Sequence, residues 1–255
     1  ISPQLEGEEM PIEISGFKGG DRTNIELPKV QRNFLKALKE AGKKVVFVNC
    51  SGSAIALTPE TESCDAILQA WYPGQEGGEA VARVLFGEYN PAGKLPITFY
   101  KNSEQLPDFK DYSMKGRTYR YMNDALFPFG YGKSYTSFKI GDAQLSSSTL
   151  KKDEQIKLTI PVSNVGKKDG TEVVQVYVKD PTDTDGPLKT LKAYQRIEVK
   201  AGATAQAVIT LDSKNFELFD AATNTVRAKA GNYEVYYGNS SADKDLKKIM
   251  VNYEY

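Results

Sequence analysis

The sequence predicts an α/β domain followed by an all-β domain, and two contrasting patterns carry this fold class. Residues 24–100 alternate helical segments with short apolar runs, which is typical of a mainly parallel sheet flanked by helices. From about Tyr135 onward, apolar and polar residues alternate, with Gly, Asp and Pro turns between the runs. Such alternation is typical of strands with one buried face and predicts a β-sandwich. A chain of 255 residues is long enough for both domains.

The elements of the α/β part follow in order along the chain. Pro28 opens a helix that ends at Gly42. Its expected apolar stripe consists of Val30, Phe34, Leu35 and Leu38. The next elements are a strand at 45–48, expected to be buried on both faces, a strand at 66–71, a turn at 72–74, a helix at 76–86 and a third strand at 95–99.

The all-β part is predicted to contain about seven strands in roughly 100–120 residues. The clearest are at 156–162, 173–178, 194–199, 205–211 and 233–237, with a short helical turn at 216–219. The boundary falls near Phe138, so the predicted domains are 1–137 and 138–255. The irregular connection 101–134, rich in Tyr, Gly and Pro, is assigned to the first domain.

Composition excludes some classes of partner. Lys and Arg (33) balance Asp and Glu (33), and no basic stripe is present, so we expect no nucleic-acid partner. The apolar runs are too short to span a bilayer, so we expect no membrane span. The chain starts at Ile1 without an initiator Met or signal features, and we interpret it as a processed or excised piece.

The chain has no histidine, which removes the commonest general base and any Ser-His or Cys-His relay. Acid–base chemistry would then require carboxylates, lysines or tyrosines. Glu6, Glu8 and Glu9 lie together on a Gly-containing loop that suits this role, although a solvated acidic loop has the same pattern. The sequence has no cluster of His and Cys for a metal, and Cys50 and Cys64 are interpreted as buried free thiols, with a disulfide left open.

Four further motifs each have a functional and a structural interpretation. The glycines at 74–78 lack the spacing and the Gly-Lys-Ser/Thr ending of a phosphate-binding loop, so nucleotide binding is rejected. Asp21 and Arg22 precede a helix, where such a pair more often fixes a loop than contacts a ligand. Trp71 is interpreted as core rather than a sugar platform. The aromatic residues at 112–135 are interpreted as packing residues, with the wall of a sugar site as the alternative.

Longer motifs run through the whole chain. They are SPQLEGEEM (2–10), GGDRTNIELP (19–28), AWYPGQEGGEAVARVLFGEYNPAGKLPITFY (70–100), GRTYRYM (116–122), FPFGYGKSYTSF (127–138), VSNVGKKDGTEVVQVYV (162–178) and LKAYQRIEVKAG (191–202). Taken in this order, they resemble the C-terminal part of a family 3 glycoside hydrolase. The resemblance implies a flavodoxin-like α/β sandwich domain followed by a fibronectin type III-like β-sandwich.

Members of that family are retaining enzymes that remove terminal β-linked sugars from the non-reducing end. This chemistry needs two carboxylates about 5–5.5 Å apart, a nucleophile and a general acid/base. The resemblance implies that the nucleophile is an Asp on an N-terminal (β/α)8 barrel, which this chain lacks. It implies that the acid/base is Glu8, with Glu6 and Glu9 as alternatives, and it makes Asp21 and Arg22 weak candidates for substrate contact.

The implied partners are an oligosaccharide or aryl β-glycoside substrate, of glucose or xylose, and the barrel of the same enzyme. No cofactor or metal is implied, and the implied location is periplasmic or secreted. Because the nucleophile is absent from the chain, a non-catalytic carbohydrate-binding or structural fragment remains the rival interpretation.

Overall fold

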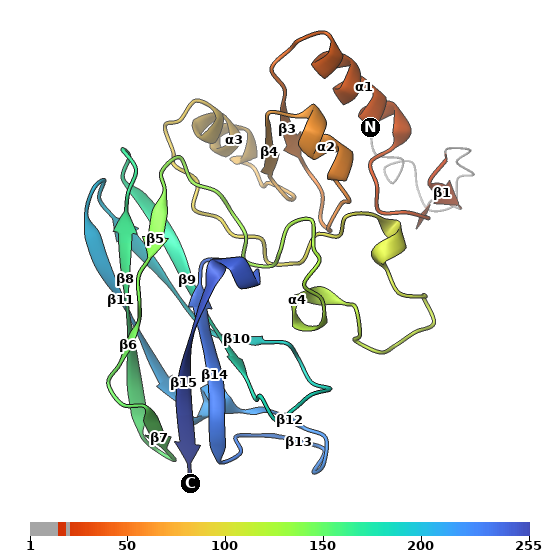
Figure 1. Cartoon of the computed structure of the whole chain (residues 1–255). Coiled ribbons are helices and arrows are strands. Elements are labelled where there is room, and N and C mark those ends of the chain that lie inside the picture. The colour runs from red at the N-terminus through yellow and green to blue at the C-terminus, as the bar shows by residue number, and fades with distance from the viewer. Residues whose placement is uncertain (1–14, 19–20) are drawn as a thin grey trace. The chain divides into compact units, whose positions relative to one another are not determined.

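The computed structural model describes residues 15–18 and 21–255 (Figure 1). Contacts divide the chain into two compact units that interleave along the sequence. The first contains the described part of Ile1–Ala82 together with Thr98–Gly116 and Asp124–Phe127. The second contains Arg83–Ile97, Arg117–Asn123 and Pro128–Tyr255. Part of the connection predicted to belong to the first domain thus makes its contacts in the second unit, and the domain limits 1–137 and 138–255 stay a prediction.

The first unit is an α/β structure. Its elements are β1 (Phe17–Lys18), β2 (Asp21–Arg22), α1 (Lys29–Glu40), β3 (Val46–Asn49), α2 (Thr58–Ser63), β4 (Ala66–Gln69) and the 3₁₀ turn η2 (Ser103–Gln105). The helix α3 (Gly77–Leu85) begins in this unit, and its last residues belong to the second. β1 and β2 pair in antiparallel orientation. β3 and β4 pair in parallel, with Val46 opposite Ala66 and Asn49 opposite Gln69. The parallel pair confirms the α/β class expected from the alternation of helix and strand.

The core of the first unit uses only part of the predicted stripe of α1. Leu35 is buried with Val45, Leu57 and other apolar residues, and Leu38 packs against this cluster. Val30 and Phe34, however, are 73% and 63% exposed, so the described residues cover only part of the stripe. The apolar stripe therefore predicted the helix correctly, but only two of its four residues, Leu35 and Leu38, pack in the core of this unit.

Three further expectations for the first part were wrong. β3 is not buried on both faces, because Val46 is 51% exposed. No strand forms at 95–99, where Phe99 makes only an isolated bridge to Phe127 and where Pro96 has no N–H to donate to a ladder. Cys50 is exposed because it follows the last residue of β3 on a loop, whereas Cys64 is buried as expected, and both thiols are free.

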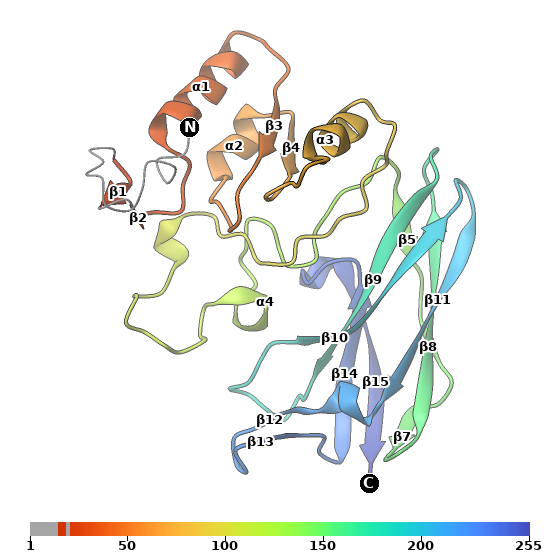
Figure 2. The ribbon, with the colours of Figure 1, turned by 180° about the vertical axis from the view of Figure 1, so that it is seen from behind.

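The second unit is a β-sandwich, as predicted (Figures 1 and 2). One sheet has the order β10-β9-β14-β15-β7, and the other has the order β11-β8-β5 with β6 also paired to β8. The elements of the unit are α4 (Thr118–Tyr121), β5 (Phe138–Ile140), β6 (Gln144–Leu145), β7 (Thr149–Lys151), β8 (Gln155–Asn164), β9 (Gly170–Lys179), β10 (Thr190–Val199), β11 (Thr204–Asp212), η3 (Ser213–Phe216), β12 (Leu218–Asp220), β13 (Thr225–Arg227), β14 (Gly231–Gly238), η4 (Asp243–Asp245) and β15 (Leu246–Glu254).

The period of two along these strands builds the core between the sheets. On β8, Ile156, Leu158, Ile160 and Val162 are all buried, and alternate residues of β9 and β14 join them in one cluster. All five strands located from the sequence are present. The helical turn expected at 216–219 lies earlier, at Ser213–Phe216, where Asp212 caps it by accepting a hydrogen bond from the Lys214 N–H.

Aromatic residues of the connection cover the outer face of the five-stranded sheet. Tyr119 stacks on Phe129 with ring centroids 4.5 Å apart and meets the buried ring of Tyr177 edge-on at 5.6 Å. The Leu191 N–H donates to the Tyr119 hydroxyl over 3.0 Å. Burial of these rings raises the pKa of both Tyr119 and Tyr177. For Tyr119 and Phe129 the interpretation as packing residues is therefore confirmed.

Candidate functional site

The three candidate acid/base residues, Glu6, Glu8 and Glu9, lie outside the described residues. Asp21 is described only through its backbone, which pairs with Lys18 in the antiparallel β1–β2 pair. Among the predicted site residues, the structure therefore gives side-chain contacts only for Arg22.

Arg22 is engaged by its own loop. Its Nη2 donates to the Glu26 carbonyl, four residues further along. The Glu26 carboxylate in turn accepts from Ser103, through the N–H at 2.8 Å and the hydroxyl at 2.5 Å. Burial acts to raise the pKa of Glu26, but the hydrogen bonds from Ser103 outweigh it and hold that pKa below its usual value. Arg22 and Glu26 thus fasten the segment before α1 to the 3₁₀ turn η2, which supports the structural interpretation of Arg22.

The carboxyl ends of β3 and β4 form a polar edge in the same unit. Because the strands are parallel, their last residues, Asn49 and Gln69, lie side by side. The buried Asn49 amide donates to Gln69 Oε1 at 2.6 Å and to Ser51 Oγ at 3.0 Å. Gln69 Nε2 donates back to the Ser51 carbonyl at 3.1 Å. This edge of an open α/β sheet is where such folds commonly bind ligands, and here its two loops are fixed by one amide network.

An aromatic cluster supports the loop that leaves β4. Trp71 meets Phe99 edge-on with ring centroids 6.2 Å apart, and Phe99 meets Phe127 at the same distance. Phe99 is 1% exposed, so Trp71, which is itself only partly buried, packs onto a buried ring; this contact supports a packing role for Trp71. The residue after it, Tyr72, is 75% exposed at the polar edge.

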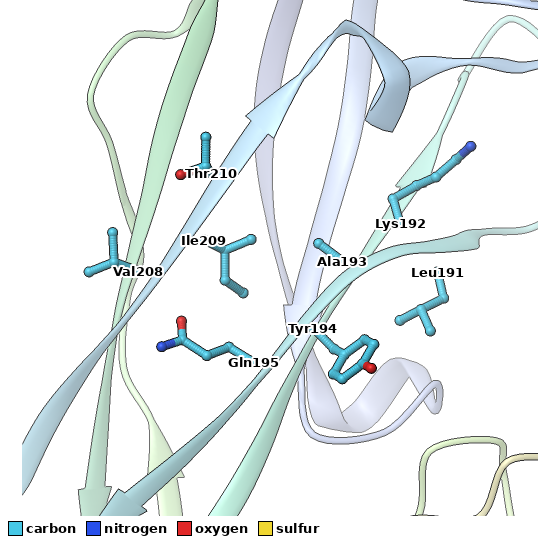
Figure 3. A pocket seen from close by; sticks show the side chains of 8 residues that line it. All are labelled: Leu191, Lys192, Ala193, Tyr194, Gln195, Val208, Ile209 and Thr210. Atoms are coloured by element: carbon cyan, nitrogen blue, oxygen red, sulfur yellow. The ribbon is translucent and has the colours of Figure 1, made fainter.

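The sandwich has a groove of about 610 Å³ between β10 and β11 (Figure 3). In Figure 3 the Gln195 side chain extends toward β11, and its Oε1 is buried without a hydrogen-bond partner. Lys192 points away and donates to the Glu217 carbonyl. None of the groove-lining residues carries a carboxylate, so this groove has no means of glycoside hydrolysis.

A buried ion pair explains one of the long motifs. Lys94 Nζ lies 2.8 Å from Glu172 Oε1, with side chains 12% and 5% exposed. The carboxylate also accepts from the Asn239 amide at 3.0 Å and from the Val173 N–H at 2.7 Å. Lys94 belongs to the YNPAGK run, so this part of the motif joins the segment before residue 98 to β9 within the second unit.

The described part of the chain offers no arrangement of three or more His, Cys, Asp or Glu side chains that could hold a metal ion. Among the same residues, no helix combines the length and the apolar character needed to cross a membrane.

Comparison with known families decides the relationship. The profile of the glycosyl hydrolase family 3 C-terminal domain matches residues 2–135. The chain belongs to glycoside hydrolase family 3. The profile of the fibronectin type III-like domain matches residues 172–241, within the sandwich. Both parts of the resemblance seen in the motifs are thereby confirmed.

Individual relatives agree with this assignment. The chain is 64% identical over 251 residues to a xylan 1,4-beta-xylosidase of Xylanibacter ruminicola, covering 98% of this chain and 29% of that protein. It is 38% identical to a periplasmic beta-glucosidase of Salmonella typhimurium, covering 88% of this chain and 31% of that protein. A beta-glucosidase structure from Listeria innocua in complex with glucose superposes with a TM-score of 0.80 at 29% identity, covering 94% of this chain and 35% of that chain. The chain thus spans about a third of the length of these relatives.

Proposed function

We propose that this chain is the C-terminal part of a retaining, exo-acting β-glycosidase that releases terminal β-xylosyl or β-glucosyl units. The observation that carries the proposal is the 64% identity to a protein named as a xylan 1,4-beta-xylosidase, sustained over 98% of the chain. The α/β part, with proposed limits 1–137, would contribute to the active site. The sandwich, with proposed limits 138–255, would support it.

In this proposal Glu8 is the general acid/base, with Glu6 and Glu9 as alternatives. It protonates the leaving-group oxygen in the first step and deprotonates the attacking water in the second. The nucleophile, an Asp, lies on an N-terminal (β/α)8 barrel outside this chain. The absence of histidine from the chain supports a carboxylate in the acid/base role.

The exposed apolar residues of the first unit support the proposal that this chain is part of a larger protein. Val30 and Phe34 lie one helical turn apart on α1, and Val46 lies on β3, all more than half exposed. Single exposed apolar residues are common, but a helix stripe left open is a surface that another part of a protein covers. We propose that the rest of the full-length enzyme, including its barrel, covers this surface. The name of the Salmonella relative supports a periplasmic or secreted location.

The test uses the full-length protein and the 255-residue chain side by side. With an aryl β-xyloside or β-glucoside, proton NMR of the full-length reaction should show the β-anomer as the first sugar released, before mutarotation. The isolated chain should be inactive, because an acid/base without its nucleophile contributes at most about 10²–10⁴-fold. An α-anomer as first product contradicts retention, and specific turnover by the isolated chain contradicts the division of the two carboxylates.

A second candidate function is non-catalytic sugar binding by the sandwich. The groove between β10 and β11 favours it, since the exposed Tyr194 ring and the unpartnered Gln195 oxygen are groups that can contact a sugar. Binding of xylo-oligosaccharides to the isolated chain, lost in Tyr194→Ala, would support this alternative.

A further inference from the structure

The backbone is strained at the point where the chain leaves β4. Trp71 has a φ of +58°, in the left-handed region that bulky L-residues rarely adopt. Such conformations are unfavourable and gather at ligand sites. The conformation lets the Trp71 ring pack edge-on against Phe99 while the next residue, Tyr72, stays 75% exposed.

Tyr72 is exposed, yet a glycine of the neighbouring loop fixes the place of its ring. The ring lies so close to Gly52 that a Cβ added there would be 2.4 Å from Tyr72 Cε2 and 2.9 Å from Cζ. Gly52 follows β3 by three residues, and Tyr72 follows β4 by three residues. Two loops from adjacent parallel strands therefore meet at this ring.

The loops on which the ring rests are themselves held. Ser51, next to Gly52, accepts hydrogen bonds from both Asn49 and Gln69, the last residues of the two strands. The Ala70 N–H donates to the Asn49 carbonyl at 2.9 Å, which ties the start of the second loop to the first strand. A large aromatic ring kept exposed on a rigid support is pre-organised for a flat ligand, because little side-chain freedom is lost on binding.

We propose that Tyr72 is a stacking platform for a sugar ring on the leaving-group side of the scissile bond. The inference rests on the proposed glycosidase function and names one of its specificity residues. A pyranose ring presents a face of C–H groups that packs on an aromatic ring such as that of Tyr72. The carboxyl edge of a parallel sheet is also where ligands of open α/β folds bind.

The first test measures Tyr72→Ala in the full-length enzyme on two substrates. Xylobiose places a sugar on the leaving-group side, whereas β-xylosyl fluoride places none there; cellobiose and β-glucosyl fluoride serve if glucose is the preferred sugar. The kcat/KM for the disaccharide should fall about tenfold, the size of one good aromatic contact, and that for the fluoride should not change. Tyr72→Phe should retain the disaccharide rate. Tyr255→Ala, which removes a tyrosine that is 70% exposed on the sandwich, is the matched control and should change neither rate.

The second test moves the ring without removing it. Gly52→Ala adds a methyl group in the space of the Tyr72 ring, so it should lower the disaccharide rate selectively although Tyr72 is present. The double variant Gly52→Ala/Tyr72→Ala should be no worse than Tyr72→Ala alone, because both changes remove the same contact.

Each other outcome overturns the inference. Equal loss on both substrates with a lowered melting temperature means that another part of the protein packs on Tyr72. Unchanged disaccharide kinetics in Tyr72→Ala means that the ring contacts no sugar, while the enzyme's activity on the fluoride leaves the proposed function standing. If the unmutated full-length protein hydrolyses none of these substrates, the proposed function fails and this inference fails with it.

Discussion

Replacing Lys94 with Met should strongly destabilise the sandwich unit. Met keeps most of the length and apolar character of the lysine stem but removes the amine that lies 2.8 Å from the Glu172 carboxylate. The two side chains are 12% and 5% exposed, so the charge left on Glu172 cannot be hydrated in place of the lost partner. The amine also donates to the Gly132 carbonyl at 3.2 Å, and this contact is lost too.

The magnitude follows from what remains around the carboxylate. Removing one partner of a buried ion pair costs about 3–5 kcal/mol. Glu172 keeps two donors, the Asn239 amide and the Val173 N–H, so the lower end of that range, about 3 kcal/mol, is expected. Adding Glu172→Gln removes the unpaired charge and should restore roughly half of the loss.

Urea unfolding of the 255-residue chain, followed by circular dichroism of its strands, measures this effect. With a slope of about 2 kcal/mol per molar urea, the midpoint should fall by roughly 1.5 M. Lys247→Met is the matched control, since Lys247 forms an ion pair with Asp142 in which the side chains are 41% and 93% exposed. Its cost should stay below about 1 kcal/mol. Equal midpoints for the two variants would refute the reasoning that burial makes the Lys94 pair important.

Two more predictions concern the two units separately. Val176→Ala, at a side chain with no exposure on β9, should cost about 2 kcal/mol or more and lower the melting temperature of the full-length enzyme. It should leave the kinetics of the folded fraction unchanged, and a tenfold rise in KM without loss of stability would instead place the sandwich at the substrate. Asp65 accepts from the Val45 N–H at 2.9 Å and from Lys44, which lowers its pKa to about 2. A lowered pKa stabilises the fold above the unfolded pKa near 4, and the contribution disappears as the pH falls toward 2. In Asp65→Asn, acid unfolding should therefore lose part of its steepness between about pH 4 and 2, and an unchanged acid profile would contradict the link.

The strands of the sandwich could be predicted closely because the pattern within each strand determines which side chains are buried. Alternation along β8 and β9 directly encodes which side chains face the core, and Gly, Asp and Pro mark the turns between strands. The sequence did not reveal the strand β15, whose residues read Leu-Lys-Lys-Ile-Met-Val-Asn-Tyr-Glu, because two adjacent lysines interrupt the alternation. Pairing with β14 and with β7 supplies the structure that the pattern lacks.

The α/β part was harder because burial there depends on what lies beyond the segment. An apolar stripe on α1 shows that a face is suited to being covered, but it does not show which part of the protein covers it. Leu35 is buried in an apolar cluster of the first unit, whereas Val30 and Phe34 are exposed in the part of the chain that the structure describes. The chain spans only about a third of the length of its relatives.

The polar edge could be predicted only in part. The runs of apolar residues located β3 and β4, and the alternation of helical and apolar segments predicted a mainly parallel sheet. The exposed ring of Tyr72 gave no signal beyond its place in a turn, since its position depends on a tertiary contact with Gly52, twenty residues earlier.

The most direct test of the proposed mechanism is azide rescue of Glu8→Ala in the full-length enzyme. An activated aryl β-glycoside needs little protonation to depart, so the glycosyl-enzyme should still form and then accumulate without a general base. Azide needs no base, and it should raise the turnover and give a β-glycosyl azide with retained configuration. Rescue in Glu6→Ala or Glu9→Ala, but not in Glu8→Ala, would assign the acid/base role to that glutamate instead. Absence of rescue in all three variants would contradict the claim that this chain supplies the acid/base.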